Sequence, residues 1–302
     1  MTVINTNNAA TLTANALTKN ERAMSQAMER LSTGVRINSA SDDAAGLAIS
    51  SRMTSQVNGL NQAVRNGNDA ISFLQTADGA LVEVTNMLQR MRELAVQASS
   101  GTMGTTDIAA LDTEFDALRL EINRVALNTE WNGTAIFPTG AAASKSFQVG
   151  ANASQSISIT MANIQSMGDS NEVTTDTASI FGGTKLDNDG DGSNDDDDMG
   201  SFDLTSSTTA IGPTGTIFGM DSAIEAINSE RATIGATINR LEYAVDNLAN
   251  VSQNTSASRS RILDADYASE TTELARTQII QQAGTAMLSQ ANQQAQSVLA
   301  LL

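Results

Sequence analysis

The sequence predicts a mainly α-helical chain, built as a long antiparallel bundle of coiled-coil type with nested N- and C-terminal helices. Three observations lead to this prediction. Apolar residues recur at heptad spacing through about 44–99. Aromatic residues make up only 3% of the chain, so a thin core must be filled by Ala, Leu, Val, Ile and Met. After a polar stretch, the heptad spacing returns at residue 221 and continues to the C-terminus.

The longest predicted helix covers about 55 residues, which makes a rod on the order of 80 Å long. The apolar residues of its second half follow gaps of three and four: Ile71, Leu74, Ala77, Leu81, Val84, Leu88, Met91, Ala95 and Ala98. A helix with such a continuous apolar seam is not stable alone in water, so the chain must supply partner helices.

Two other segments have apolar seams that match this helix. One covers about 107–127 and follows a short loop around Gly101, which favours an antiparallel hairpin with the long helix. The other covers about 221–260, where Arg231 occupies the one seam position that is not apolar. Between them, alternating apolar residues and an Asn-Gly turn predict a small β-hairpin element at 131–161.

The two terminal helices, predicted at about 12–35 and 263–302, have only each other as partners. Their apolar stripes are thin: Leu17, Met24, Met28 and Leu31 in the first, and Ile280, Met287, Val298 and Leu302 in the second. Burying two such stripes against each other offsets too little ordering entropy. We therefore expect these ends to be poorly ordered in a lone subunit and to fold when several chains pack their stripes together. The alternative is a self-contained bundle with frayed ends.

The predicted organisation is nested in three layers. Residues 1–42 and 263–302 form a terminal coiled-coil domain, and residues 43–161 and 220–262 form a helical rod domain with the β-hairpin. Residues 162–219 are rich in Ser, Thr, Asp and Gly and form a variable, surface-exposed β and loop insertion.

Composition excludes several classes of function. The chain has no His and no Cys, which removes catalysis and zinc sites that depend on these residues, and no cofactor is required by any motif. A formal charge of −17 disfavours nucleic acid and anionic membranes as partners. The chain has no stretch of 18 apolar residues and no cleavable secretory signal, so we expect no enzyme, no membrane span and, if it is secreted, another export route.

One acidic run in the insertion has the spacing of a calcium loop. Carboxylates fall at loop positions 1, 3, 5, 9 and 12, with Gly192 at the sharp turn: Asp187, Asp189, Asp191, Asp195 and Asp198. Clustered oxygens at this spacing can bind Ca²⁺. The alternative is a solvated acidic loop, since no helices flank the run and position 12 is the shorter Asp.

Long motifs at both ends of the chain resemble one protein family. The sequence is similar to bacterial flagellin over about 1–161 and 221–302. The segments that match the family pattern are 31–49 (LSTGVRINSASDDAAGLAI), 88–97 (LQRMRELAVQ), 147–152 (FQVGAN), 258–267 (SRSRILDADY) and 281–288 (QQAGTAML).

The resemblance implies a structural subunit that self-assembles into the bacterial flagellar filament for swimming motility. It further implies export, unfolded, by the flagellar type III system, with an export chaperone and a filament cap protein as partners. The product would be a secreted, extracellular helical homo-polymer. Two alternatives stay open: a hook–filament junction protein, which shares the terminal motifs, and a calcium-dependent secreted adhesin.

The resemblance also implies a receptor contact. In flagellins that the animal Toll-like receptor for flagellin recognises, an Arg, a Leu and a Glu make the contact, and the matching positions here are Arg90, Leu94 and Glu114. The alternative is that Arg90 and Glu114 belong to a solvated helix face and that Leu94 flanks the apolar seam.

Overall fold

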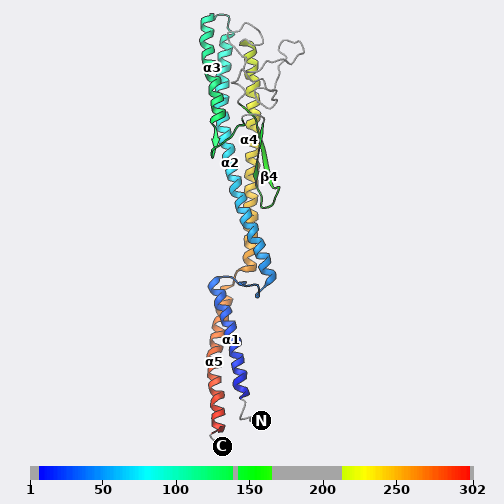
Figure 1. Cartoon of the computed structure of the whole chain (residues 1–302), viewed down its shortest axis with the longest axis vertical. Coiled ribbons are helices and arrows are strands. Elements are labelled where there is room, and N and C mark those ends of the chain that lie inside the picture. Colours follow the sequence, from blue (N-terminus) through cyan, green and yellow to red (C-terminus); the bar gives the residue numbers. More distant parts are fainter. Residues whose placement is uncertain (1–6, 139–141, 165–212, 300–302) are drawn as a thin grey trace. The chain divides into compact units, whose positions relative to one another are not determined.

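The computed structural model describes the backbone of residues 7–138, 142–164 and 213–299 (Figure 1). The described part is mainly α, with five helices and two small antiparallel sheets, which confirms the predicted fold class. Its contacts divide the chain into two compact units. We call residues 1–58 and 251–302 the terminal unit, and residues 59–250 the central unit.

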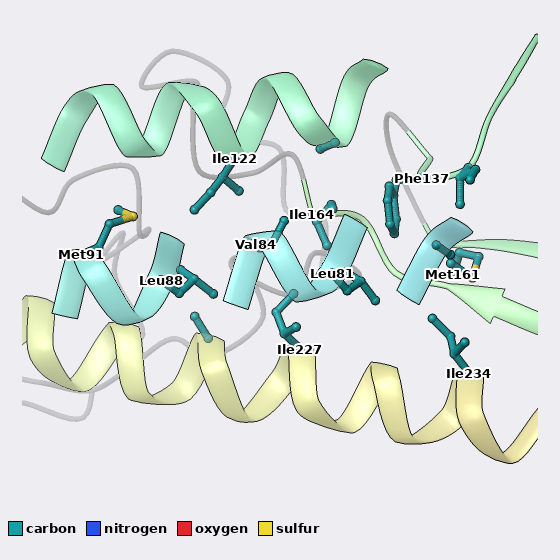
Figure 2. Close-up of a cluster of buried hydrophobic side chains, with 14 of the residues drawn as sticks. Leu81, Val84, Leu88, Met91, Ile122, Phe137, Met161, Ile164, Ile227 and Ile234 are labelled. Atoms are coloured by element: carbon teal, nitrogen blue, oxygen red, sulfur yellow. The ribbon is translucent and has the colours of Figure 1, made fainter. Parts of the chain in front are cut away.

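The central unit contains most of helix α2 (Ala44–Ala98), all of α3 (Thr105–Asn128) and most of α4 (Pro213–Leu263). Its core is the predicted seam: Leu74, Leu81, Val84, Leu88 and Met91 are fully buried. Figure 2 shows Leu81, Val84, Leu88 and Met91 of α2 between α3, which carries Ile122, and α4, which carries Ile227 and Ile234. The predicted partners of the long helix are therefore the observed ones.

Helix α4 begins eight residues before the predicted start at residue 221. Pro213 is its first residue, a position where the fixed backbone angle of proline favours a helix and no N–H is needed. The first turns are anchored by Thr216 and Met220, which are fully buried. The sparse apolar pattern before residue 220 hides this extension in the sequence.

Two short β-hairpins lie between α3 and α4 along the chain. Strands β1 (Glu130–Trp131) and β2 (Thr134–Ala135) turn through Asn132 and Gly133, both with positive φ as a tight primed turn requires. Strands β3 (Ala143–Gln148) and β4 (Ser156–Met161) pair in register through Phe147 opposite Ile157. Ile159 and Met161 of β4 are buried in the core of the central unit. The ring of Phe147 in β3 packs against the ring of Phe73 in α2, with 5.6 Å between the ring centroids.

The terminal unit is organised by α1 (Asn8–Thr33) and α5 (Tyr267–Leu299), which pack side by side in antiparallel directions (Figure 1). The sequence predicts one helix from about 263 onward, but α4 runs to Leu263 and α5 starts at Tyr267. The break at 264–266 arises because Asp264 pairs as a β-bridge with Val35. The side chain of Asp266 then accepts a hydrogen bond from the Ala268 N–H at 3.0 Å and opens α5.

Most of the predicted insertion, including the acidic run with its five candidate calcium ligands, lies outside the described residues. Within the described ranges, no helix combines the length and the hydrophobicity that a membrane-spanning helix needs.

Candidate assembly surfaces

The contact between α1 and α5 is held largely by polar side chains. The Asn20 side-chain amide is buried and donates to the Thr277 carbonyl oxygen at 2.7 Å. Arg30 pairs with Glu270 at 3.1 Å, and the Asn7 amide donates to a carbonyl of α5 at 3.2 Å. These groups fix which residues of the two helices face each other, since each polar group needs its partner.

The apolar part of this contact is thin. Among the described residues of the terminal unit, the buried apolar side chains are Ala27, Ile37 and Val57. Leu17 lies against Gly284, where an added Cβ would come within 3.3 Å of the leucine Cδ1. The missing side chain at Gly284 thus lets the two helices approach closely.

Several apolar side chains remain exposed on the antiparallel pair of α1 and α5, which we call the terminal hairpin although its helices come from opposite ends of the chain. Of the predicted subunit-packing residues, Leu17, Met24 and Leu31 are half-buried, whereas Met28 is 55% exposed, Ile280 43% and Met287 60%. The side chains of Val298 and Leu302 lie outside the described residues. Leu12 and Ile279 are also exposed. They were not predicted as packing residues because they do not fall at the heptad spacing of the two apolar stripes.

The flagellin-like motifs from the two ends of the chain meet in the terminal unit. The Arg36 N–H donates to the Leu263 carbonyl at 2.6 Å, and its guanidinium donates to the Ile262 carbonyl at 2.8 Å. The Tyr267 hydroxyl donates to the Leu31 carbonyl at 3.1 Å. Both motifs, 31–49 and 258–267, can be recognised in the sequence, and each falls where a predicted helix is interrupted. The contact between them was not predicted.

Asp42 organises the turn between α1 and α2. Its Oδ2 accepts hydrogen bonds from the backbone N–H groups of Asn38 and Ser39 at 3.2 and 3.0 Å, and from the Ser39 hydroxyl at 3.1 Å. These hydrogen bonds, first the one from the Ser39 backbone, lower the pKa of the Asp42 carboxyl. The neighbouring Asp43 accepts from the Gly46 N–H at 2.9 Å and caps the first turn of α2, as a helix start favours.

The three predicted receptor-contact residues are placed unequally. Arg90 donates to Glu114 of α3 at 2.9 Å and to Glu93 at 3.0 Å, and all three side chains are exposed. The hydrogen bond to Glu114, followed by that to Glu93, raises the pKa of Arg90. Leu94 is fully buried in the core of the central unit. The structure therefore brings Arg90 and Glu114 together on the surface and places Leu94 beneath it.

Comparison with known proteins accounts for both ends of the chain. Residues 4–143 match the model of the bacterial flagellin N-terminal helical region, and residues 217–302 match that of the C-terminal helical region. The chain belongs to the bacterial flagellins. It is 42% identical to the flagellin of Bacillus subtilis over 99% of both chains, and 35% identical to flagellin B of Vibrio cholerae over 99% of both. The crystal structure of Bacillus cereus flagellin, 29% identical, covers 61% of this chain and 88% of its own, with a TM-score of 0.44.

Membership of the flagellins confirms the central functional prediction. The chain is a structural subunit that polymerises into the flagellar filament, an extracellular assembly for motility, and it is not an enzyme. Within the part of the chain that the structure describes, no cluster of acidic side chains could hold a metal ion. The surfaces that matter for this flagellin are therefore those that meet other subunits.

Proposed function

We propose that this flagellin joins its filament by packing the apolar side chains left exposed on the terminal hairpin against those of neighbouring copies. The supporting observation is that Met28, Ile280 and Met287 remain solvent-exposed while the α1–α5 contact is satisfied by polar side chains. Burial of one large apolar side chain contributes about 1.5–3 kcal/mol. Because every subunit adds the same side chains, this contribution repeats along the polymer.

The hypothesis predicts that a charge on this stripe blocks assembly without unfolding the subunit. In Met287→Glu, the carboxylate would have to be desolvated at each contact, so we expect elongation of seeded filaments to stop. The matched control is Ser289→Glu, which places the same charge on an exposed position of α5 that faces away from Met287. Light scattering and electron microscopy of seeded samples measure elongation, and circular dichroism checks the fold. Normal elongation of Met287→Glu would remove the proposal.

Export by the flagellar type III system, with an export chaperone and a filament cap protein as partners, is proposed on the resemblance of both ends to the family. Secretion of the chain from cells with and without a functional export apparatus tests it, since equal secretion would contradict this route. Polymerisation of the purified chain distinguishes a filament subunit from a junction protein. A junction protein would not elongate into long polymers by itself.

Recognition by the Toll-like receptor for flagellin is proposed for the surface around Arg90 and Glu114. Their exposure and their ion pair support this surface, whereas Leu94 contributes packing beneath it. Receptor activation should fall in Arg90→Ala and Glu114→Ala but not in Arg124→Ala, an exposed arginine of α3. Unchanged activation by the first two variants would contradict the proposal.

Calcium binding is proposed for the acidic run of the insertion on its ligand spacing alone. Calorimetry of the full chain with millimolar Ca²⁺ should give a binding heat that disappears when Asp187 and Asp189 are changed to Asn. If the unchanged chain gave no binding heat, the calcium site would be excluded and the alternative of a solvated acidic loop would be favoured. The hypothesis of a calcium-dependent adhesin would then lose its basis.

A further inference from the structure

The apolar seam of α4 is interrupted once, and the interruption is paired across the helix interface. Arg231 lies between Ile227 and Ile234, where the 3-4 spacing calls for an apolar residue. Its Nε donates to Asp78 Oδ1 of α2 at 2.8 Å. The two side chains are 34% and 38% exposed, so the pair lies at the border of the buried core. A position in the apolar seam of α4 is thus occupied by a charged residue, Arg231, whose ion-pair partner on α2 is Asp78.

A second ion pair joins the same two helices 14 residues further along α2 and 10 residues away along α4, which is about three to four helical turns. Arg92 of α2 donates from Nε to Asp221 of α4, and its Nη2 donates to the other carboxylate oxygen at 3.3 Å. By register we mean the alignment that sets which residues of two antiparallel helices stand opposite each other. In the central unit, both ion pairs fit one register of α2 against α4 to within about one helical turn. Gly67 against Val245 belongs to the same register.

The apolar residues by themselves allow other registers. Both seams repeat every seven residues, so a slide of α4 by one heptad sets apolar residues opposite apolar residues again. The same slide moves Asp78 opposite Ile224 or Ile238 and moves Arg231 opposite Ile71 or Thr85. It leaves Arg92 opposite Thr214 or Asn228. Both pairs are lost, and the residues then opposite Asp78 and Arg231 carry no charge.

We infer that the Asp78–Arg231 and Arg92–Asp221 ion pairs select the register of α2 against α4, and that Asp78–Arg231 is the stronger determinant. A slip by one heptad sets the unpaired Asp78 against an isoleucine at the border of the core, whereas the Arg92–Asp221 pair, with side chains 43% and 50% exposed, loses a more exposed contact. The role is specificity, because a hydrophobic residue in place of Arg231 would make the seam continuous and stabilise the helix pair in any register.

This inference concerns the folded form of one subunit and stands whether or not the terminal hairpin drives assembly. Its consequence for the filament is direct. Subunits with slipped helices would differ in length from their neighbours by about 10 Å per heptad, so one register is needed for identical subunits to stack.

The test measures register and stability separately in the full chain. The protein has no native cysteine, so spin labels can be attached only at Glu83→Cys and Asn247→Cys, two exposed positions well separated along the axis. Pulsed electron paramagnetic resonance then reports their distance. In Asp78→Ala with Arg231→Ile, we expect a second distance that differs by about 10 Å. We also expect a melting temperature at least as high as that of the unchanged pair.

Two further variants complete the test. The exchange Asp78→Arg with Arg231→Asp should restore a single distance, because the pair is rebuilt with reversed polarity. Removal of a pair within one helix, Glu121→Ala with Arg124→Ile in α3, should leave the single distance unchanged. A single unshifted distance in Asp78→Ala with Arg231→Ile would overturn the inference, as would a second distance in the Glu121 and Arg124 control.

Discussion

The two units of this flagellin bury their apolar residues to different extents. In the central unit, α2 is fully buried along one face from Ala70 to Ala98, and α3, α4 and strand β4 all contribute side chains to that core. In the described part of the terminal unit, Ala27 is the one buried apolar side chain of α1 and α5. The two helices are also joined by the hydrogen bond from Asn20 to Thr277 and by the ion pair of Arg30 with Glu270.

This difference separates what one subunit completes by itself from what it leaves to its neighbours. The central unit buries the α2 seam against α3, α4 and β4 within the chain, although large apolar side chains outside this core, such as Phe218 and Tyr243, remain exposed. The terminal unit has little apolar core and leaves methionine and isoleucine side chains exposed, which is the surface proposed above for contact with a second copy. The units therefore differ in how much apolar core each one completes within the chain.

The largest effect is expected in the central core. Leu81→Ala removes a fully buried side chain of α2 and should cost about 2–5 kcal/mol of unfolding free energy, through lost burial and the cavity left behind. Urea denaturation followed by circular dichroism measures this. The half-buried Leu17 of α1 provides the comparison: Leu17→Ala should cost clearly less. Equal costs would show that the two units do not differ as described.

A smaller effect is expected from the polar contact of the terminal unit. Asn20→Ala removes the hydrogen bond to the Thr277 carbonyl, which is worth about 1 kcal/mol. Amide hydrogen exchange in α1 and α5 should accelerate about fivefold, with the central unit unchanged. Asn15→Ala, at an exposed position of the same helix, is the control. Faster exchange throughout the central unit would mean that the two units unfold together.

The helices of the central unit could be predicted from the sequence because their seams are long and regular. The predicted stretch of about 44–99 matches α2 (Ala44–Ala98), and the turn at Asn132-Gly133 was equally clear, since both residues tolerate positive φ. The break between the helices predicted at about 221–260 and 263–302 lies a few residues later than predicted, at 264–266, because the pairing of Asp264 with Val35 that fixes it is a contact between opposite ends of the chain. Local periodicity contains no information about such contacts.

The candidate surfaces were predicted in part. The sequence identified Arg231 as an exception in its seam but could not name Asp78 as its partner, because the register of two separated helices follows from tertiary packing. The stripe at Met28, Ile280 and Met287 was predicted from spacing and is exposed in the subunit. The burial of Leu94 was not predicted, since a residue beside a seam becomes buried only when a third element covers it.

Acidification should strengthen the central unit through Glu230. This carboxyl of α4 is partly buried and accepts a hydrogen bond from the Ala162 N–H at 3.4 Å, and burial raises its pKa above the ordinary value of 4.5. The folded state therefore binds a proton more tightly than the unfolded state, and stability rises as the pH falls through the raised pKa toward 4.5.

The variant Glu230→Gln tests this effect, because it keeps the acceptor oxygen and removes the charge. We expect it to exceed the unchanged protein in urea midpoint at pH 7, and the difference to close as the pH approaches 4.5. Glu225→Gln, on an exposed face of the same helix, serves as the control. A difference that does not vary with pH would mean that burial at Glu230 has no electrostatic cost.

Acidification should weaken the terminal unit through Asp42, with the opposite sign and the smallest effect. Its carboxylate accepts hydrogen bonds from Asn38 and Ser39, which lower its pKa below the ordinary value of 3.8. The stabilisation is complete above pH 3.8 and is lost as the pH falls through the lowered pKa. Asp42→Asn should therefore exchange the Ser39 amide faster than the unchanged chain at pH 6, and the difference should close as the pH falls through the lowered pKa of Asp42. Glu21→Gln of α1 is the control. Equal exchange of the Ser39 amide in Asp42→Asn and the unchanged chain at pH 6 would mean that the charge of Asp42 does not stabilise the turn. The predicted pH response would then rest on Glu230 of the central unit alone.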